Sequence, residues 1–171
     1  MGISYEDILK LGELKYKKLI VGGAALPFYG VNRGTIDIDI EVFIDNQQDF
    51  EKVQEFLDKN NIQADLTNDF ERWNIIPLPN GFKGRLIETE ISGLFVLSPV
   101  DYIFSKIRRG TLQDVEDSLS VFDKMELNID DVIAAKNNIE LPLDPLSIIF
   151  NGRFDTFISQ IGELTQSSQS L

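Results

Sequence analysis

The 171-residue sequence contains no cysteine and no histidine. The absence of cysteine excludes disulfide bonds, thiolate nucleophiles, zinc ribbons and iron–sulfur clusters. The absence of histidine excludes Ser-His-Asp triads, Cys-His pairs and imidazole metal sites. Any chemistry must therefore use carboxylates, lysine, arginine, hydroxyl groups or backbone amides, and any metal must be one that prefers oxygen ligands.

Long apolar runs and basic residues are also scarce. The apolar runs are too short to span a membrane, and the N-terminus has neither the basic nor the apolar region of a signal peptide. We therefore expect a cytoplasmic protein with no membrane partner. With Lys+Arg 16 and Asp+Glu 28, the net charge is −12, which disfavours broad attachment to nucleic acid or anionic lipid. A local basic cleft remains compatible with this charge.

The hydropathy pattern predicts a folded chain of helix, mixed α/β and then helices. A hydrophobic content of 43% gives enough apolar surface for a real core. We expect an α/β core over residues 1–97, helices packed on that core over 98–164, and a frayed Ser/Gln-rich tail over 165–171. Within the core, residues 18–21 predict a short strand and residues 46–59 an amphipathic helix.

The strictest alternation in the sequence runs over residues 33–43 and predicts a strand. Asp37 and Asp39 would share one face of it, because side chains alternate along a strand. The opposite, core-facing positions hold Ile36, Ile38 and Ile40. Two carboxylates on one face can hold one or two Mg²⁺ (or Mn²⁺) ions, which neutralise the phosphates of a nucleoside triphosphate. The alternative is an ordinary solvated sheet face.

A pair of glycines, Gly22 and Gly23, follows the first predicted strand. Glycines between a strand and a helix let the backbone approach a ligand, and the helix N-terminus offers free N–H groups to phosphate oxygens. The glycines and the aspartates would lie side by side if the strand at 18–21 pairs with the Asp strand. Neither Rossmann nor P-loop glycine spacing is present.

At these residues a family resemblance emerges. The Gly-Gly pair followed by Arg-Gly-Thr-Ile-Asp-Ile-Asp-Ile at 33–40 resembles the signature of the DNA polymerase β-type nucleotidyltransferase superfamily. More narrowly, it is similar to the small prokaryotic branch related to AbiE-type toxin nucleotidyltransferases. Residues 78–86 and 101–117 resemble further elements of that branch, so that the similarity covers about residues 15–125. It implies an α+β fold, with a nucleotidyltransferase-like mixed sheet flanked by helices and a C-terminal helical segment.

The resemblance also implies roles for residues of the first motif. Gly22 and Gly23 would hold the triphosphate, with Arg33 and Thr35 beside them. The carboxylates of Asp37 and Asp39 would bind Mg²⁺.

It implies further roles outside that motif. Lys106 would contact phosphate, together with Arg109 from the same basic cluster, and Asp114 or Asp117 would organise the site. The bland alternatives are a solvated helix face for the basic cluster and a helix-capping role for Asp114. The single tryptophan, Trp73, is most simply a core residue.

Full catalysts of this superfamily carry a third carboxylate on a neighbouring strand. Glu88 is our first candidate for this catalytic and metal-binding role and Glu90 our second, because both share one face of the segment 85–91 by parity. Glu41 shares the face of the two aspartates but lies farther along their strand.

Two functions from different classes follow. The first is a Mg²⁺-dependent nucleotidyltransferase that moves a nucleotide from NTP to a hydroxyl of RNA, protein or a small molecule, as a toxin–antitoxin or defence component. The alternative is a catalytically inactive nucleotide-binding or partner-binding module of the same fold, whose acidic surface would suit a basic partner protein. A purely structural domain is the third and blandest interpretation.

Overall fold

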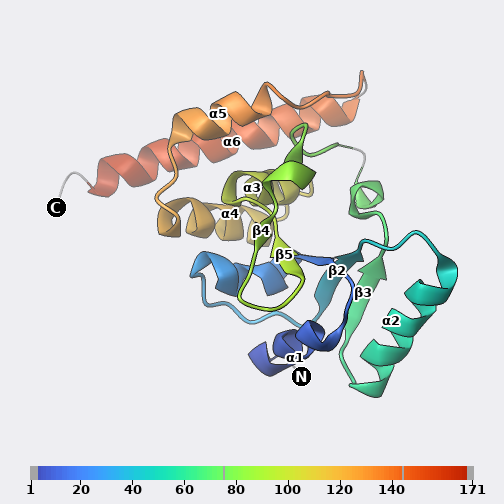
Figure 1. Cartoon of the computed structure of the whole chain (residues 1–171). Coiled ribbons are helices and arrows are strands. Elements are labelled where there is room, and N and C mark those ends of the chain that lie inside the picture. The colour runs from blue at the N-terminus through green and yellow to red at the C-terminus, as the bar shows by residue number, and fades with distance from the viewer. Residues whose placement is uncertain (1–3, 75, 144, 169–171) are drawn as a thin grey trace. The chain divides into compact units, whose positions relative to one another are not determined.

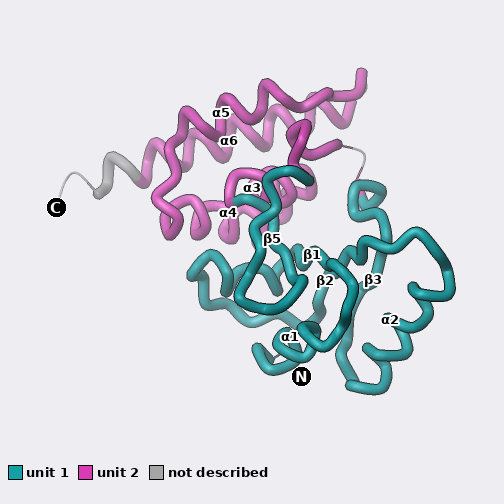
Figure 2. The backbone as a smooth tube through the Cα atoms, viewed as in Figure 1, with its two compact units in different colours: residues 1–73, 83–98 teal, residues 74–82, 99–171 magenta. Residues whose placement is uncertain are grey.

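A computed structural model describes residues 4–74, 76–143 and 145–168, and the chain divides into two compact units (Figure 2). Unit 1 comprises residues 1–73 and 83–98, and unit 2 comprises residues 74–82 and 99–171. The last three residues of the expected tail lie outside the described residues.

Unit 1 carries the sheet (Figure 1). Its strands are β1 (Lys18–Val21), β2 (Ile38–Val42), β3 (Ala64–Thr67), β4 (Ile87–Glu88) and β5 (Leu94–Val96). Its helices are α1 (Tyr5–Lys10), α2 (Gln47–Lys59) and the 3₁₀ segments η1 (Leu11–Glu13), η2 (Gly22–Tyr29) and η3 (Phe70–Trp73). A further 3₁₀ segment, η4 (Phe82–Arg85), begins at the last residue of unit 2's first segment.

The strand order in the sheet is β3-β2-β1-β5-β4. β1 pairs antiparallel with β2 and parallel with β5, β2 pairs parallel with β3, and β4 and β5 form an antiparallel hairpin. The parallel step from β2 to β3 is made through α2, because parallel neighbours need a long crossover. The sheet is therefore mixed, and the predicted α+β class with a mixed sheet and C-terminal helices is confirmed.

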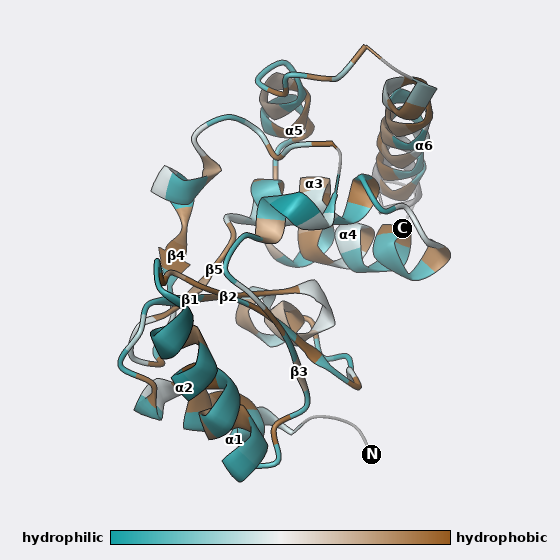
Figure 3. Ribbon diagram, turned by 90° about the vertical axis from the view of Figure 1, so that its right-hand side faces the viewer, coloured by the Kyte–Doolittle hydropathy of each residue, from teal (hydrophilic) through white to brown (hydrophobic). Residues whose placement is uncertain are grey.

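β1 is the central strand, and all four of its residues are buried. Its apolar residues are buried, as are Ile38 and Ile40 of β2 and Val53 of α2. In Figure 3 the strands are predominantly brown, whereas α2 carries a teal outer face. Lys18 is buried as well, and its ammonium donates to the backbone oxygens of Leu14, Tyr16 and Ser92, which satisfies its three donors.

The Asp strand is shorter than the alternation predicts. β2 begins at Ile38, and Ile36, which we expected in the core, is 69% exposed. The cause is the lack of strand partners. β1 ends opposite Asp39 and β3 begins opposite Ile38, so residues 33–37 have no strand on either side to extend the ladder.

Unit 2 is helical. It contains α3 (Pro99–Ile107), α4 (Leu112–Lys124), α5 (Ile129–Lys136) and α6 (Pro145–Ser168). Aromatic rings join these helices: the ring of Phe104 on α3 stacks on that of Phe154 on α6 at 5.7 Å, and Phe122 on α4 meets Phe157 edge-on at 6.4 Å. Among the described residues, no helix is long and apolar enough to cross a membrane.

Candidate active site

The turn after β1 has a geometry that only glycine fulfils. Gly22 has a φ of 65°, in the left-handed region. A Cβ added there would also lie 2.1 Å from the Oδ2 atom of Asp39, which no real side chain tolerates. Val21 stands opposite Asp39 in the antiparallel pair, so the expected pairing of the first strand with the Asp strand is confirmed. The Asp39 carboxylate therefore lies directly on the glycine turn.

The second glycine contacts the segment before β2. A Cβ on Gly23 would lie 3.0 Å from the hydroxyl of Thr35 and 3.1 Å from Nη2 of Arg33. These side chains border a cavity of about 160 Å³, which Asn32 also lines. The structure thus brings together five of the predicted residues: Gly22, Gly23, Arg33, Thr35 and Asp39.

A second carboxylate stands beside Asp39. Asp65 of β3 is its direct partner in the parallel register of β2 and β3. Directly paired residues of adjacent strands point to the same side and are about 5 Å apart. Both carboxylates line a cavity of about 300 Å³, together with Leu66 and Trp73. The two acids therefore face one cavity.

Sequence analysis did not identify Asp65, although a signal was present. The acid is flanked by apolar residues in Ala64-Asp65-Leu66, and this strand follows the helix that leaves the Asp strand. A strand reached from its predecessor through a helical crossover often lies parallel beside it. Such pairing brings Asp65 next to Asp39 on the preceding strand.

Asp37 lies just before β2. The Thr35 hydroxyl donates to its backbone oxygen at 3.2 Å and to its carboxylate Oδ1 at 3.4 Å. Within the described ranges no group of three or more acidic residues is arranged to hold a metal ion. Mg²⁺ usually takes only one or two protein carboxylates and completes its shell with water and substrate phosphates, so the facing pair of Asp39 and Asp65 fits this requirement.

Glu88 does not occupy the expected place. It lies on β4 at one edge of the sheet, and β5 and β1 separate it from β2. Three strand spacings put it roughly 14 Å from the Asp strand. The expectation that Glu88 lies on a strand neighbouring the aspartates is therefore wrong, and the reason is the parallel pairing of β1 with β5, which moves the hairpin outward. Glu90, the second candidate, accepts a hydrogen bond from the hydroxyl of Tyr5.

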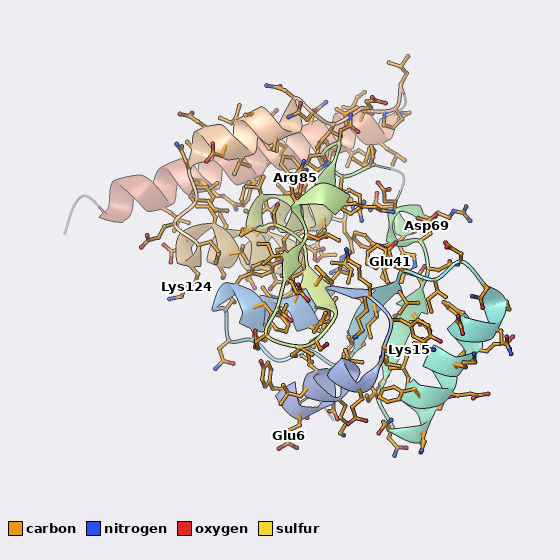
Figure 4. All side chains as sticks on the ribbon, viewed as in Figure 1. Glu6, Lys15, Glu41, Asp69, Arg85 and Lys124 are labelled. Carbon is orange, nitrogen blue, oxygen red and sulfur yellow. The ribbon has the colours of Figure 1, made fainter. Side chains whose placement is uncertain are left out.

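By strand parity, Glu41 is the other acid on the Asp39 side of β2. Its side chain is labelled in Figure 4. It is 2% exposed, and the ammonium of Lys83 lies 3.9 Å from its carboxylate. Burial raises the pKa of Glu41, although the charge of Lys83 and the backbone N–H of Phe70 oppose the increase. Glu41 is thus buried beside a lysine, whereas Asp39 and Asp65 line the cavity.

The remaining predicted residues belong to unit 2, where they form an ion-pair network. The ammonium of Lys106 is 2.9 Å from the carboxylate of Asp117 and 3.3 Å from that of Asp114. Arg109 donates two hydrogen bonds to the same Asp114 carboxylate, at 2.6 and 2.8 Å. The Lys106 side chain is only 3% exposed, so the alternative interpretation, a solvated helix face, does not describe it.

Asp114 also caps α4, as the alternative interpretation predicted. It forms a capping box with Thr111, each residue's side chain accepting from the other's backbone N–H. Burial alone would raise the pKa of Asp114, but the hydrogen bonds from Arg109 and Thr111 and the charge of Lys106 outweigh it and lower the pKa to about 2. The proposed contacts of Lys106 and Arg109 with phosphate remain predictions.

Comparison with known proteins identifies the class. A family described as nucleotidyltransferases of unknown function (DUF6036) matches residues 5–147, most of the chain. The protein therefore belongs to this family, and the resemblance to the nucleotidyltransferase superfamily is confirmed at that level. Comparison with curated proteins gives no significant match.

Proposed function

We propose that the protein transfers a nucleotide from NTP to an acceptor hydroxyl in a Mg²⁺-dependent reaction at the site of unit 1. The observation that carries the proposal is the position of Asp39, which lies on the glycine turn and beside Asp65 at the same time. A residue so placed connects a phosphate-binding turn to a pair of cation-binding carboxylates.

The residues around the glycine turn are suited to the triphosphate. Arg33 brings a guanidinium, Thr35 a hydroxyl and Gly23 a close backbone approach, and all three border one cavity. Arginine and backbone N–H groups are strong partners for phosphate oxygens. Asp39 and Asp65 would hold Mg²⁺, which when bound neutralises charge on the phosphates.

Asp65 is also the natural base of the site. Its carboxylate faces the same cavity as Asp39 and is available to accept the proton of the acceptor hydroxyl. The inactive alternative rested on the lack of an evident third carboxylate. Asp65 is an acid on the strand next to Asp39, as that role requires, and this pair supports our proposal of an active transferase. RNA, a protein side chain and a small molecule are the candidate acceptors, and a toxin or defence role in an AbiE-like branch is part of the proposal.

The decisive experiment incubates the purified protein with each labelled NTP, Mg²⁺ and cellular RNA or lysate, and identifies the macromolecule that acquires label. We expect labelling that chelation of Mg²⁺ abolishes and that Asp39→Asn and Asp65→Asn each reduce at least about 100-fold. Asp45→Asn, an exposed acid just beyond β2, is the matched control and should label normally. Equal labelling by Asp65→Asn and Asp45→Asn would contradict the role of Asp65.

A further inference from the structure

Trp73 does not lie in the core, so the prediction from the sequence that it is a core residue is wrong. Its side chain is 43% exposed and borders the cavity that Asp39 and Asp65 line. Large aromatic side chains are usually buried, and one left partly exposed beside a pair of carboxylates can offer part of its ring to a ligand.

The indole ring of Trp73 packs against the ring of Phe70. Phe70, which is 4% exposed, meets Trp73 edge-on at 5.8 Å between ring centroids and 79° between planes. Both residues belong to η3, a single short 3₁₀ segment. The contact restricts the motion of the indole while 43% of the side chain stays exposed, so that the ring can receive a ligand with little loss of side-chain entropy.

We propose that Trp73 is the stacking platform for a nucleobase at this site. The proposal rests on the proposed function, because the acid pair in the same cavity would hold the Mg²⁺ that binds the phosphates of the nucleotide. Stacking on an aromatic face is available to every base, and the cavity of about 300 Å³ has room for one ring system beside the carboxylates. The base belongs either to the donor NTP or to the terminal nucleotide of an RNA acceptor.

The chain offers a direct measurement, since Trp73 is its only tryptophan. The chain also contains four tyrosines, so the indole is excited selectively, at a wavelength that tyrosine does not absorb, and the emission then reports this ring alone. We expect saturable quenching of the emission by NTP with Mg²⁺ and none by inorganic tripolyphosphate with Mg²⁺, which lacks a base. Quenching by a short single-stranded RNA but not by NTP would assign the base to the acceptor. Absence of quenching by both ligands would overturn the proposal.

Affinity measured by calorimetry separates stacking from phosphate binding. Trp73→Ala should weaken binding of the quenching ligand roughly 5- to 100-fold, and Trp73→Phe should restore most of it. Ile87→Ala is the matched control, because Ile87 is 44% exposed but lies on the distant edge strand β4. Tripolyphosphate should bind the wild type and Trp73→Ala equally.

The outcomes also separate this inference from the proposed function. Tight NTP binding to the wild type, with unchanged emission and full affinity in Trp73→Ala, would overturn the stacking role and leave the transferase standing. Failure of the wild type to bind NTP or tripolyphosphate at all would contradict the proposed function itself.

Discussion

At the scale of single residues, the site depends on two glycines, and a side chain at each would disturb it for a different reason. Gly22 combines a left-handed backbone with a carboxylate in contact, whereas Gly23 has only the contact with Thr35 and Arg33. Gly30 has the left-handed backbone, with a φ of 74°, but nothing lies within 4 Å of the place where its Cβ would be. A side chain at Gly30 would therefore strain only the backbone, whereas one at Gly22 would strain the backbone and also displace Asp39.

We predict that Gly22→Ala and Gly30→Ala each lower the free energy of unfolding by about 1–2 kcal/mol, because alanine is strained at positive φ. Only Gly22→Ala should also weaken binding of NTP with Mg²⁺, because its methyl group displaces the Asp39 carboxylate. Urea unfolding and calorimetry on both variants test this. Equal NTP affinity in the two variants would contradict the placement of Asp39 on the turn.

At the scale of elements, the start of α4 concentrates charge. Asp114 accepts hydrogen bonds from Thr111 and Arg109 and pairs with Lys106, while its own side chain is fully buried. The folded pKa of about 2 lies below the ordinary value of 3.8, so the ionised form is stabilised by folding. This stabilisation is fully present above pH 3.8 and is lost as the pH falls through about 2.

We predict that Asp114→Asn lowers the free energy of unfolding by about 2–3 kcal/mol at neutral pH, because Lys106 and Arg109 lose that carboxylate while Lys106 keeps Asp117. Thr111→Ala removes the cap but keeps the ion pairs and should cost about 1 kcal/mol. Denaturant unfolding at a series of pH values measures both. A difference between wild type and Asp114→Asn that persists unchanged at pH 2 would refute the pKa assignment.

At the scale of the whole molecule, the chain passes between its two units three times, after residues 73, 82 and 98. Segment 74–82 belongs to the helical unit although it lies among the strands in sequence. The backbone N–H of Asn80 donates to the oxygen of Asn138 at 2.9 Å, and Arg108 donates to the backbone oxygen of Ile76 at 3.1 Å. The two units are therefore interleaved along the chain.

We predict that fragments 1–98 and 99–171, expressed together, co-purify, because segment 74–82 completes the helical unit in trans. Replacing the buried Ile76 and Leu78 by aspartate should abolish co-purification, since each would place a charge in an apolar core. The exposed Asn80→Asp serves as the control. Unchanged co-purification of the double variant would show that the segment does not join the fragments.

The local patterns of the sequence by themselves determined several secondary-structure elements, turns and helix caps of this protein. Residues 18–21, the acids of the Asp strand and the diglycine turn were identified because alternation, glycine and capping signals act within a few residues. The capping box of Thr111 and Asp114 was visible for the same reason. These features needed no knowledge of distant contacts.

Only the tertiary structure decided the partners of these residues. The strand order makes Asp65, and not Glu88, the neighbour of Asp39. Lys106 is buried within an ion-pair network, and Trp73 contacts Phe70 and borders the cavity of the acid pair. The physical reason is common to all of them: strand order, burial and ion pairing depend on residues far apart in the chain, and no local spacing encodes which of several acids or aromatic rings will meet.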